Sequence, residues 1–222
     1  MAHNGLIDLY SDTQTRPSAG MRRAMAEAEV GDEQRSEDPT TIRLQERVAQ
    51  LLGKEAAVFL PSGTMCNQIA MAVHCTAGDE IIAADTAHVF SSEAGGTPTL
   101  SRAQTWPIKA DMGLFKAADV SAALRDPASR HSPRSRLLVV EQTANMGGGR
   151  VWPLAQIEEV AEVAHGNGLS VHMDGARLMN AVVASGVAAK DFAKPCDSAW
   201  IDLSKGLGCP VGGVLAGSRD FI

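Results

Sequence analysis

The sequence predicts an α/β protein with a mostly parallel sheet of seven strands and helices on both of its faces. Three observations lead to this prediction. Seven short apolar runs recur along the 222 residues, segments with helical spacing lie between them, and polar or glycine-rich turns follow several runs. Apolar runs that alternate with helices are typical of parallel strands joined by helical crossovers.

The predicted strands are short, and most are apolar throughout instead of alternating with polar residues. This continuity favours strands that are buried on both faces. The third strand is the weakest of the set. The strands are predicted at residues 56–60, 80–84, 100–107, 137–141, 169–173, 199–203 and 212–216.

Helices are predicted where apolar residues recur every three or four positions. The clearest is 40–52, which Gly53 closes. The helix at 17–29 is expected to turn one face inward, and the polar segments 31–39 and 126–135 are expected to be loops. The predicted helices span 17–29, 40–52, 65–74, 117–125, 154–167 and 176–184.

The composition favours a soluble, cytoplasmic protein. Apolar residues make up 45% and charged residues 21%, as in ordinary globular domains. The net charge of −6, without a lysine or arginine run, argues against a nucleic-acid partner. We see neither a signal peptide nor an apolar run long enough to span a membrane. The four cysteines have spacings that fit neither a zinc site nor a disulfide framework.

Lys205 and Asp174 carry the strongest functional signal. Lys205 lies in Leu-Ser-Lys-Gly-Leu-Gly beside the predicted strand 199–203, and Asp174 lies in His-Met-Asp-Gly-Ala-Arg after 169–173. Pyridoxal phosphate chemistry needs a lysine that forms a Schiff base and a carboxylate that keeps the pyridine nitrogen protonated. Alone, Lys205 would be a surface charge and Asp174 a helix N-cap. Together, at the end of the sheet where α/β proteins build sites, they predict a pyridoxal phosphate site.

The turn Ser62-Gly63-Thr64 follows a predicted strand and opens a predicted helix. Backbone N–H groups and hydroxyls at a helix N-terminus form an anion site suited to a cofactor phosphate. An ordinary N-cap explains the same residues equally well. The sequence has no G-x-x-x-x-G-K-[ST] and no G-x-G-x-x-G pattern, which argues against nucleoside triphosphates and a standard dinucleotide site.

Two histidines lie near the ends of predicted strands. His88 follows 80–84, where it could stack on a flat cofactor or move a proton, although an isolated loop histidine is usually solvated. His172 precedes Asp174 by two positions in a strand, so both side chains are expected on the same side. A metal pair would need a third ligand, which is not evident, and we predict no metal site.

These residues belong to a series of blocks that resembles the threonine aldolase and aromatic amino acid β-eliminating lyase family of fold type I pyridoxal phosphate enzymes. The first block is Ile-Asp-Leu-Tyr-Ser-Asp-Thr-Gln-Thr-Arg-Pro at 7–17, and the resemblance continues to the last residue. The other blocks lie at 30–32, 38–40, 53–57, 61–64, 93–96, 172–178 and 203–208.

The resemblance implies a catalytic role for three residues. Lys205 would form the Schiff base with pyridoxal 5′-phosphate, Asp174 would pair with the pyridinium, and His88 would stack over the ring near the substrate hydroxyl. The implied reaction is an aldol cleavage of a threonine-like β-hydroxy-α-amino acid to glycine and an aldehyde. A β-eliminating or racemising relative, and a non-catalytic fragment or subunit, stay open as alternatives.

Other residues are implied to bind the cofactor and the substrate. The cofactor phosphate would be held by Ser62, Gly63 and Thr64. Ser11 and Arg177 would bind the substrate carboxylate, and Arg177 would also contact the cofactor. The guanidinium fork of arginine suits a carboxylate.

This sequence departs from the family pattern in three respects, and the resemblance also implies an oligomer. Arg35 stands where the family usually has tyrosine, and Ala144 where it usually has a histidine near the β-hydroxyl. A larger β-hydroxy amino acid or another β-substituent therefore stays open. The small C-terminal domain of the family is expected to be largely absent, with 1–16 as an N-terminal arm and 17–222 as the cofactor-binding large domain. Subunits are expected to form a homodimer or a homotetramer.

Overall fold

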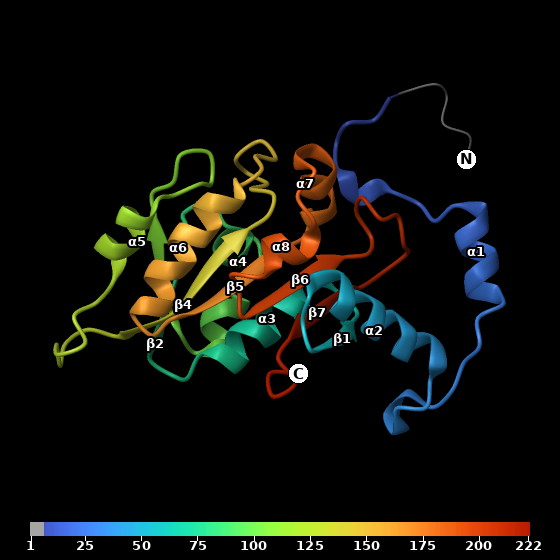
Figure 1. Ribbon diagram of the computed structural model, residues 1–222, viewed down its shortest axis with the longest axis horizontal. Coiled ribbons are helices and arrows are strands. Elements are labelled where there is room, and N and C mark those ends of the chain that lie inside the picture. The colour runs from blue at the N-terminus through green and yellow to red at the C-terminus, as the bar shows by residue number, and fades with distance from the viewer. Residues whose placement is uncertain (1–6) are drawn as a thin grey trace.

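A seven-stranded sheet forms the centre of the computed structural model, which describes residues 7–222 (Figure 1). Residues 1–6 of the predicted arm lie outside the described residues. The strands are β1 (Ala56–Leu60), β2 (Asp79–Ala84), β3 (Gln104–Ile108), β4 (Arg134–Glu141), β5 (Ser170–Gly175), β6 (Ser198–Asp202) and β7 (Gly213–Gly217). Their order is β1-β7-β6-β5-β4-β2-β3. Only β7 runs antiparallel to its neighbours, so the mostly parallel sheet is confirmed.

The third strand is shorter than predicted at its N-terminal side. Thr97–Ser101 instead forms a π-helical turn, η3. The Thr97 hydroxyl donates to the Val89 carbonyl at 2.6 Å, and the Ser101 hydroxyl donates to the Thr97 carbonyl at 2.5 Å. These bonds between side chain and backbone favour the turn over a strand, so β3 begins only at Gln104.

The predicted helices are all present, with shifted ends, and two further short helices occur. The helices are α1 (Ala19–Ala26), α2 (Pro39–Leu52), α3 (Gly63–His74), α4 (His88–Ser91), α5 (Ala117–Ala123), α6 (Leu154–Gly166), α7 (Leu178–Ser185) and α8 (Ala189–Ala193). The short 3₁₀ turns are η1 (Asp12–Gln14) and η2 (Glu33–Arg35). The unpredicted α4 and α8 have four and five residues, too few for a periodic pattern. Of the helices in residues 7–222, none is long and apolar enough to cross a membrane.

The ends of α2 follow from local sequence. Asp38 accepts a hydrogen bond from the Thr41 amide at 2.7 Å, and Pro39 occupies the first turn, where its missing N–H is not needed. Gly53 closes the helix with a φ of 63°, a conformation that glycine adopts without a steric penalty.

Helices cover both faces of the sheet, as predicted. Along β6, Ala199 and Ile201 belong to the large hydrophobic cluster that includes α2, α5, α6 and α8. Trp200, between them, belongs to a smaller cluster with Cys66 of α3. Because successive strand residues point to opposite faces, α3 covers the face to which Trp200 points, and α2, α5, α6 and α8 cover the opposite one.

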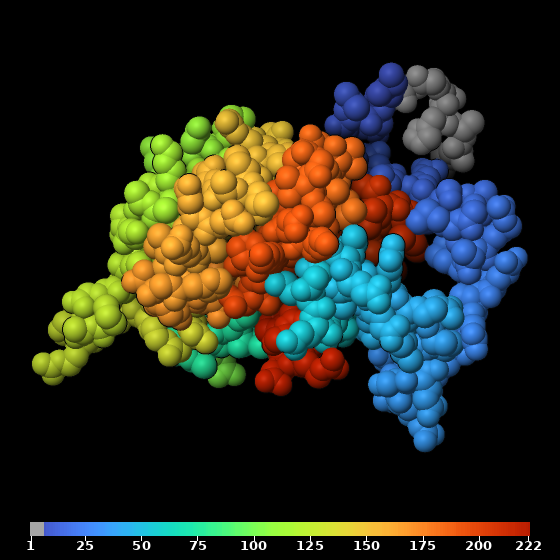
Figure 2. Space-filling model, viewed as in Figure 1, coloured from blue at the N-terminus to red at the C-terminus, as the bar shows by residue number. Residues whose placement is uncertain are grey.

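The prediction that the first helix turns one face inward is wrong for this chain. α1 has no buried residue, and Met25 is 48% exposed. The helix is capped by Ser18, whose hydroxyl accepts from the Met21 amide at 3.2 Å. Figure 2 shows this N-terminal segment beside the body of the molecule instead of within it. Its apolar side chains recur at helical spacing without a covering surface on the same chain.

Candidate active site

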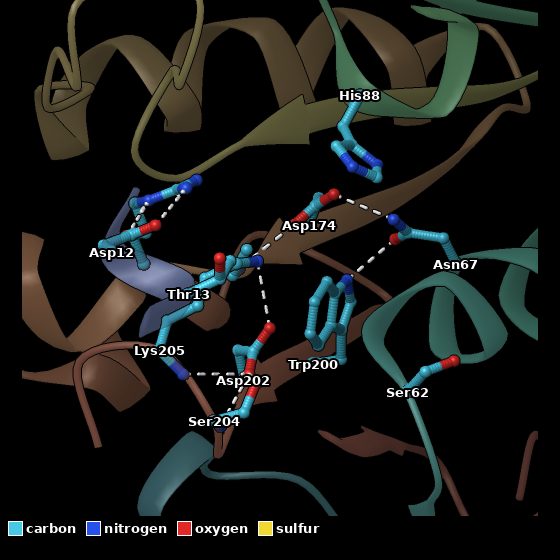
Figure 3. A network of polar contacts seen from close by, with 12 residues as sticks. Asp12, Thr13, Ser62, Asn67, His88, Asp174, Trp200, Asp202, Ser204 and Lys205 are labelled. Carbon is cyan, nitrogen blue, oxygen red and sulfur yellow. Dashed lines mark hydrogen bonds and ion pairs between the residues drawn. The ribbon is translucent and has the colours of Figure 1, made fainter. Parts of the chain in front are cut away.

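All the residues predicted for the site line one cavity of about 330 Å³. The cavity lies where the carboxyl ends of β4, β5 and β6 meet, with the start of α3 on one side and the turn η1 on another (Figure 3). Parallel strands deliver their following residues to a common edge, which explains the gathering. The predicted residues in the lining are Ser11, Ser62, Gly63, Thr64, His88, Asp174, Arg177 and Lys205.

The start of α3 forms one wall of the cavity. The Ser62 hydroxyl accepts from the Met65 amide at 3.2 Å, so the N-cap interpretation of this residue is confirmed. Thr64 also lines the cavity. The amides of the first turn of a helix have no partner within the helix, so this end of α3 can bind an anion. At Gly63, a Cβ would lie 2.1 Å from the Trp200 ring, so only glycine allows this close approach.

Gly63→Ala is expected to lower the free energy of unfolding by about 1–3 kcal/mol, because the added methyl overlaps a buried ring. Urea unfolding of both proteins measures the difference. Gly166→Ala is the matched control, because a Cβ at this helical position meets nothing within 4 Å. Equal stability of Gly63→Ala and the wild type would contradict the contact.

Asp174 is the last residue but one of β5 and is 1% exposed. Its Oδ2 accepts from Asn67 Nδ2 at 2.8 Å and its Oδ1 from the Ala176 amide at 3.0 Å. It therefore caps the turn after β5, although α7 begins only at Leu178. Burial raises the pKa of Asp174. Burial also raises the pKa of Glu141, its register partner on β4, and the nearby carboxylate of Asp174 raises that pKa further. A cation in the cavity would therefore stabilise the ionised form of the Asp174 carboxyl.

Lys205 lies in the turn after β6, and its side chain is 15% exposed. Its Nζ is 2.9 Å from Asp202 Oδ2, and Asp202 Oδ1 accepts from the amide and the hydroxyl of Ser204 at 2.7 Å each. Burial opposes ionisation of Asp202, but the bonds from Ser204 and Lys205 outweigh it and lower the pKa of this carboxyl. The site thus holds the lysine next to a fixed counter-ion.

His88 is the first residue of α4 and is held at two points. Its Nδ1 is 2.8 Å from Glu93 Oε1, and its backbone amide donates to Glu141 Oε2 at 2.7 Å. The hydrogen bond with Glu93 raises the pKa of His88, although burial opposes the shift. The imidazole is therefore positioned at the cavity wall with its Nδ1 occupied and its Nε2 available.

Glu93→Gln is expected to lower the pKa of His88, because the amide carries no charge to stabilise the imidazolium. In the wild type, this raised pKa contributes stability that is fully present below the ordinary histidine value of about 6.5 and lost as pH rises through the raised value. Proton NMR titration of the His88 ring in the variant and in the wild type measures the shift. An unchanged His88 titration would contradict the role of Glu93.

Arg177 already has a carboxylate partner in this chain. Its Nε and Nη2 lie 2.5 and 2.9 Å from Asp12 Oδ2 and Oδ1, a bidentate pair that lowers the pKa of Asp12. Asp12 belongs to η1, which Ser11 caps by accepting from the Thr13 amide at 3.2 Å. The pair fixes the N-terminal turn against the cavity. A substrate carboxylate at Arg177 would share or replace this contact.

Several lining residues were not predicted from the sequence: Asn67, Glu141, Asn145, Trp200 and Asp202. Asp202 could have been found, because it lies in the predicted strand 199–203, three residues before Lys205. Asn67 had no such signal, since its partners are 26 to 133 residues away.

The two positions that depart from the family pattern do not line the cavity. Arg35 is exposed and lies 3.6 Å from Glu37. Ala144 is 3% exposed, and its Cβ lies so near Gly113 that a Cβ there would approach within 2.6 Å.

The residues of the cavity fit pyridoxal phosphate. A helix N-terminus with two hydroxyls suits its phosphate, the buried carboxylate of Asp174 suits its ring nitrogen when protonated, and the amine of Lys205 suits its aldehyde. The glycine at position 63 lets the start of α3 lie against the Trp200 ring, which also lines the cavity. Fold and site together define an α/β enzyme of the kind that binds a cofactor through a lysine at the end of a strand.

The chain belongs to the β-eliminating lyase family, whose pattern it matches over residues 8–222. Enzymes of this family depend on pyridoxal phosphate, so the predicted family and cofactor are confirmed. The chain is 44% identical over 219 residues to a probable low-specificity L-threonine aldolase 2 of Arabidopsis thaliana, covering 97% of this chain and 62% of that protein. It is 45% identical over 217 residues to the low specificity L-threonine aldolase of Escherichia coli, covering 98% and 64%.

Solved structures agree with this membership. A putative L-allo-threonine aldolase of Listeria monocytogenes superimposes with a TM-score of 0.71 at 28% identity, covering 82% of this chain and 49% of that one. A threonine aldolase of Leishmania major gives 0.82 at 21% identity, covering 95% and 62%, which establishes the shared fold. This chain thus spans about three fifths of the length of the curated relatives it matches.

Proposed function

We propose that the protein is a pyridoxal phosphate-dependent aldolase that cleaves a threonine-like β-hydroxy-α-amino acid to glycine and an aldehyde. The observation that carries the proposal is the convergence of Lys205, Asp174 and His88 on one cavity that also contains Ser11 and Arg177. The names of the relatives support it, because several are low-specificity threonine aldolases. The reaction is a carbon–carbon bond cleavage, which makes the enzyme a lyase.

Each residue has a role that its surroundings allow. When bound, pyridoxal phosphate supplies an electron-poor ring that stabilises the carbanion left at Cα. Lys205 would hold the cofactor through its amine, and Asp174 would keep the ring nitrogen protonated. His88, whose Nδ1 is held by Glu93, would accept the proton of the β-hydroxyl at Nε2.

The remaining residues bind and orient. The turn Ser62-Gly63-Thr64 holds the phosphate with its amides and hydroxyls. Arg177 and Ser11 bind the substrate carboxylate, and the pair between Arg177 and Asp12 sets the angle of the guanidinium beforehand.

The first experiment is an absorbance spectrum of the chain with added pyridoxal phosphate, followed by borohydride reduction and peptide mapping. A reduced adduct on Lys205 supports the proposal. The loaded protein is then incubated with L-threonine, L-allo-threonine and a larger β-hydroxy amino acid, and glycine and aldehyde are measured. Ammonia and a keto acid instead would favour the β-eliminating alternative, and racemisation alone would favour the racemase. A lack of adduct would overturn the proposal.

We also infer a homodimer or a homotetramer. The exposed apolar residues of 7–38 support it: Ile7, Leu9, Tyr10 and Val30 are each at least 80% exposed. α1 likewise leaves its apolar side uncovered. A second copy offers an apolar surface of matching chemistry, and light scattering after size exclusion tests the inference. An active monomer would contradict it.

A cytoplasmic location is part of the proposal. The four cysteines lie in the described residues and are free thiols, three of them buried. Free thiols are expected in a reducing compartment. Fractionation of the producing cells tests the location.

A further inference from the structure

A chain of buried hydrogen bonds runs from α3 through β6 and β5 to the cavity. His74 Nε2 is 2.7 Å from Ser198 Oγ, which is 2.8 Å from His172 Nδ1. His172 Nε2 is 3.2 Å from Asn67 Oδ1. We refer to the linked side chains as the buried relay, made of His74, Ser198, His172 and Asn67.

The amide of Asn67 fixes the direction of the relay. The Trp200 indole N–H, which can only donate, lies 2.7 Å from Asn67 Oδ1 (Figure 3). On the opposite side, Asn67 Nδ2 donates to Asp174 Oδ2 at 2.8 Å and to Glu93 Oε1 at 3.0 Å. The oxygen of the amide therefore faces the relay, and its nitrogen faces two carboxylates.

This orientation determines every other hydrogen in the relay. Because Asn67 Oδ1 only accepts, His172 Nε2 must carry a hydrogen. Burial lowers the pKa of His172 to about 3, so its Nδ1 is a bare acceptor that takes the hydroxyl hydrogen of Ser198. The oxygen of Ser198 then accepts from Nε2 of His74, which is also neutral, since burial lowers its pKa to about 4.

All the donors thus point the same way, toward the carboxylates. Hydrogen bonds arranged in one direction polarise one another, and the polarisation strengthens the last donor in the series. That donor is Asn67 Nδ2, on Asp174 and Glu93. Burial opposes the charge of Asp174, while the bond from Asn67 favours it. Asn67 is fully buried and has all four of its hydrogen-bonding positions in use.

We infer that the buried relay orients the Asp174 carboxylate and stabilises its negative charge, with Asn67 as the positioning residue that joins the relay to the site. The inference deepens the proposed function, since Asp174 is the group assigned there to the cofactor ring. Asn67 also contacts Trp200 and, through Glu93, the ring of His88. One side chain thereby sets three walls of the cavity.

The first test needs no cofactor. ¹⁵N NMR of the imidazoles should show His74 and His172 as neutral Nε2–H tautomers between about pH 5.5 and 8, where an unperturbed histidine titrates. An Nδ1–H tautomer or an imidazolium at His172 would overturn the relay.

Ser198→Ala tests the link to Asp174. It cuts the relay at its centre and lies outside the cavity lining. The carboxyl ¹³C signal of Asp174 should titrate at a higher pH than in the wild type, since Asn67 becomes a weaker donor. The other charged or titratable groups that face Asp174 are all unchanged in this variant: Glu141, His88, Glu93, Cys66, Arg177 and Lys205.

Binding of pyridoxal phosphate gives the second readout. Ser198→Ala should weaken it by about 3–10-fold, because one buried partner is lost, while an adduct still forms on Lys205. Ser101→Ala is the control, because its buried hydroxyl bonds only to backbone. If Ser198→Ala and Ser101→Ala gave the same titration of Asp174 and the same affinity for pyridoxal phosphate, the inference would be overturned. If the wild type forms no adduct, the proposed function fails. The histidine tautomers and the titration of Asp174 then test by themselves whether the relay stabilises the Asp174 carboxylate.

Discussion

Lys205→Ala is expected to abolish covalent capture of pyridoxal phosphate and to lower turnover on the order of 10³-fold or more. Among the described residues that line the cavity, Lys205 is the only lysine, and its Nζ pairs with Asp202 there. The fold should persist, since Asp202 still accepts from the amide and hydroxyl of Ser204. The free energy of unfolding should fall by about 1–3 kcal/mol, because a buried carboxylate loses its cation.

Borohydride reduction with mass spectrometry measures capture, and urea unfolding measures stability. Lys109→Ala removes an exposed lysine and should leave both unchanged. A reduced adduct that persists in Lys205→Ala, at the same stoichiometry as in the wild type, would show that another amine is the anchor. Loss of the folded state would show that Lys205 belongs to the core instead of the site.

Asp174→Asn is expected to lower turnover by about 10²–10³-fold, since the ring nitrogen loses the charge that keeps it protonated. The amide also has one acceptor oxygen for two donors, Asn67 Nδ2 and the Ala176 amide. Cofactor binding should weaken together with turnover. Asp197→Asn, which changes a carboxyl that accepts from Val171 and pairs with His165 away from the cavity, should leave turnover unchanged.

The same substitution has a consequence for pH dependence. Burial raises the pKa of Asp174, so its contribution to stability is fully present below the ordinary carboxyl value of about 4 and is lost as pH rises through the raised value. Asp174→Asn should flatten this part of the stability curve, measured by urea unfolding across pH. A curve identical to that of the wild type would mean that Asp174 ionises as an exposed carboxyl does.

The strands of the sheet were predictable because continuous apolar runs encode them locally. β1, for example, is Ala56–Leu60 in both the prediction and the structure. The start of β3 was not, because hydroxyl bonds from Thr97 and Ser101 hold a helical turn where apolar residues suggest a strand. α1 failed for another reason: its spacing shows that one face is apolar, but not which surface covers it.

The site divides in a similar way. Lys205 and Asp174 could be predicted because each follows a recognisable strand, and parallel strands bring such ends together. Asn67 could not, because its environment is made by side chains from α3, β5, β6 and the segment at Glu93, which only the folded chain assembles. Asp12 was quoted within a block of the family resemblance, but its pairing with Arg177 became visible only in three dimensions.

The pairing of β1 with β7 has a consequence for synthesis on the ribosome. Phe59 pairs with Val214, so an apolar strand made early must wait for about 150 further residues before its neighbour exists. At roughly 5–20 residues per second, that delay is on the order of 8–30 s. During this interval, Ala56–Leu60 is an unpaired edge that other nascent chains can join. The yield of folded protein should therefore depend on chaperone supply more than on the stability of the finished fold.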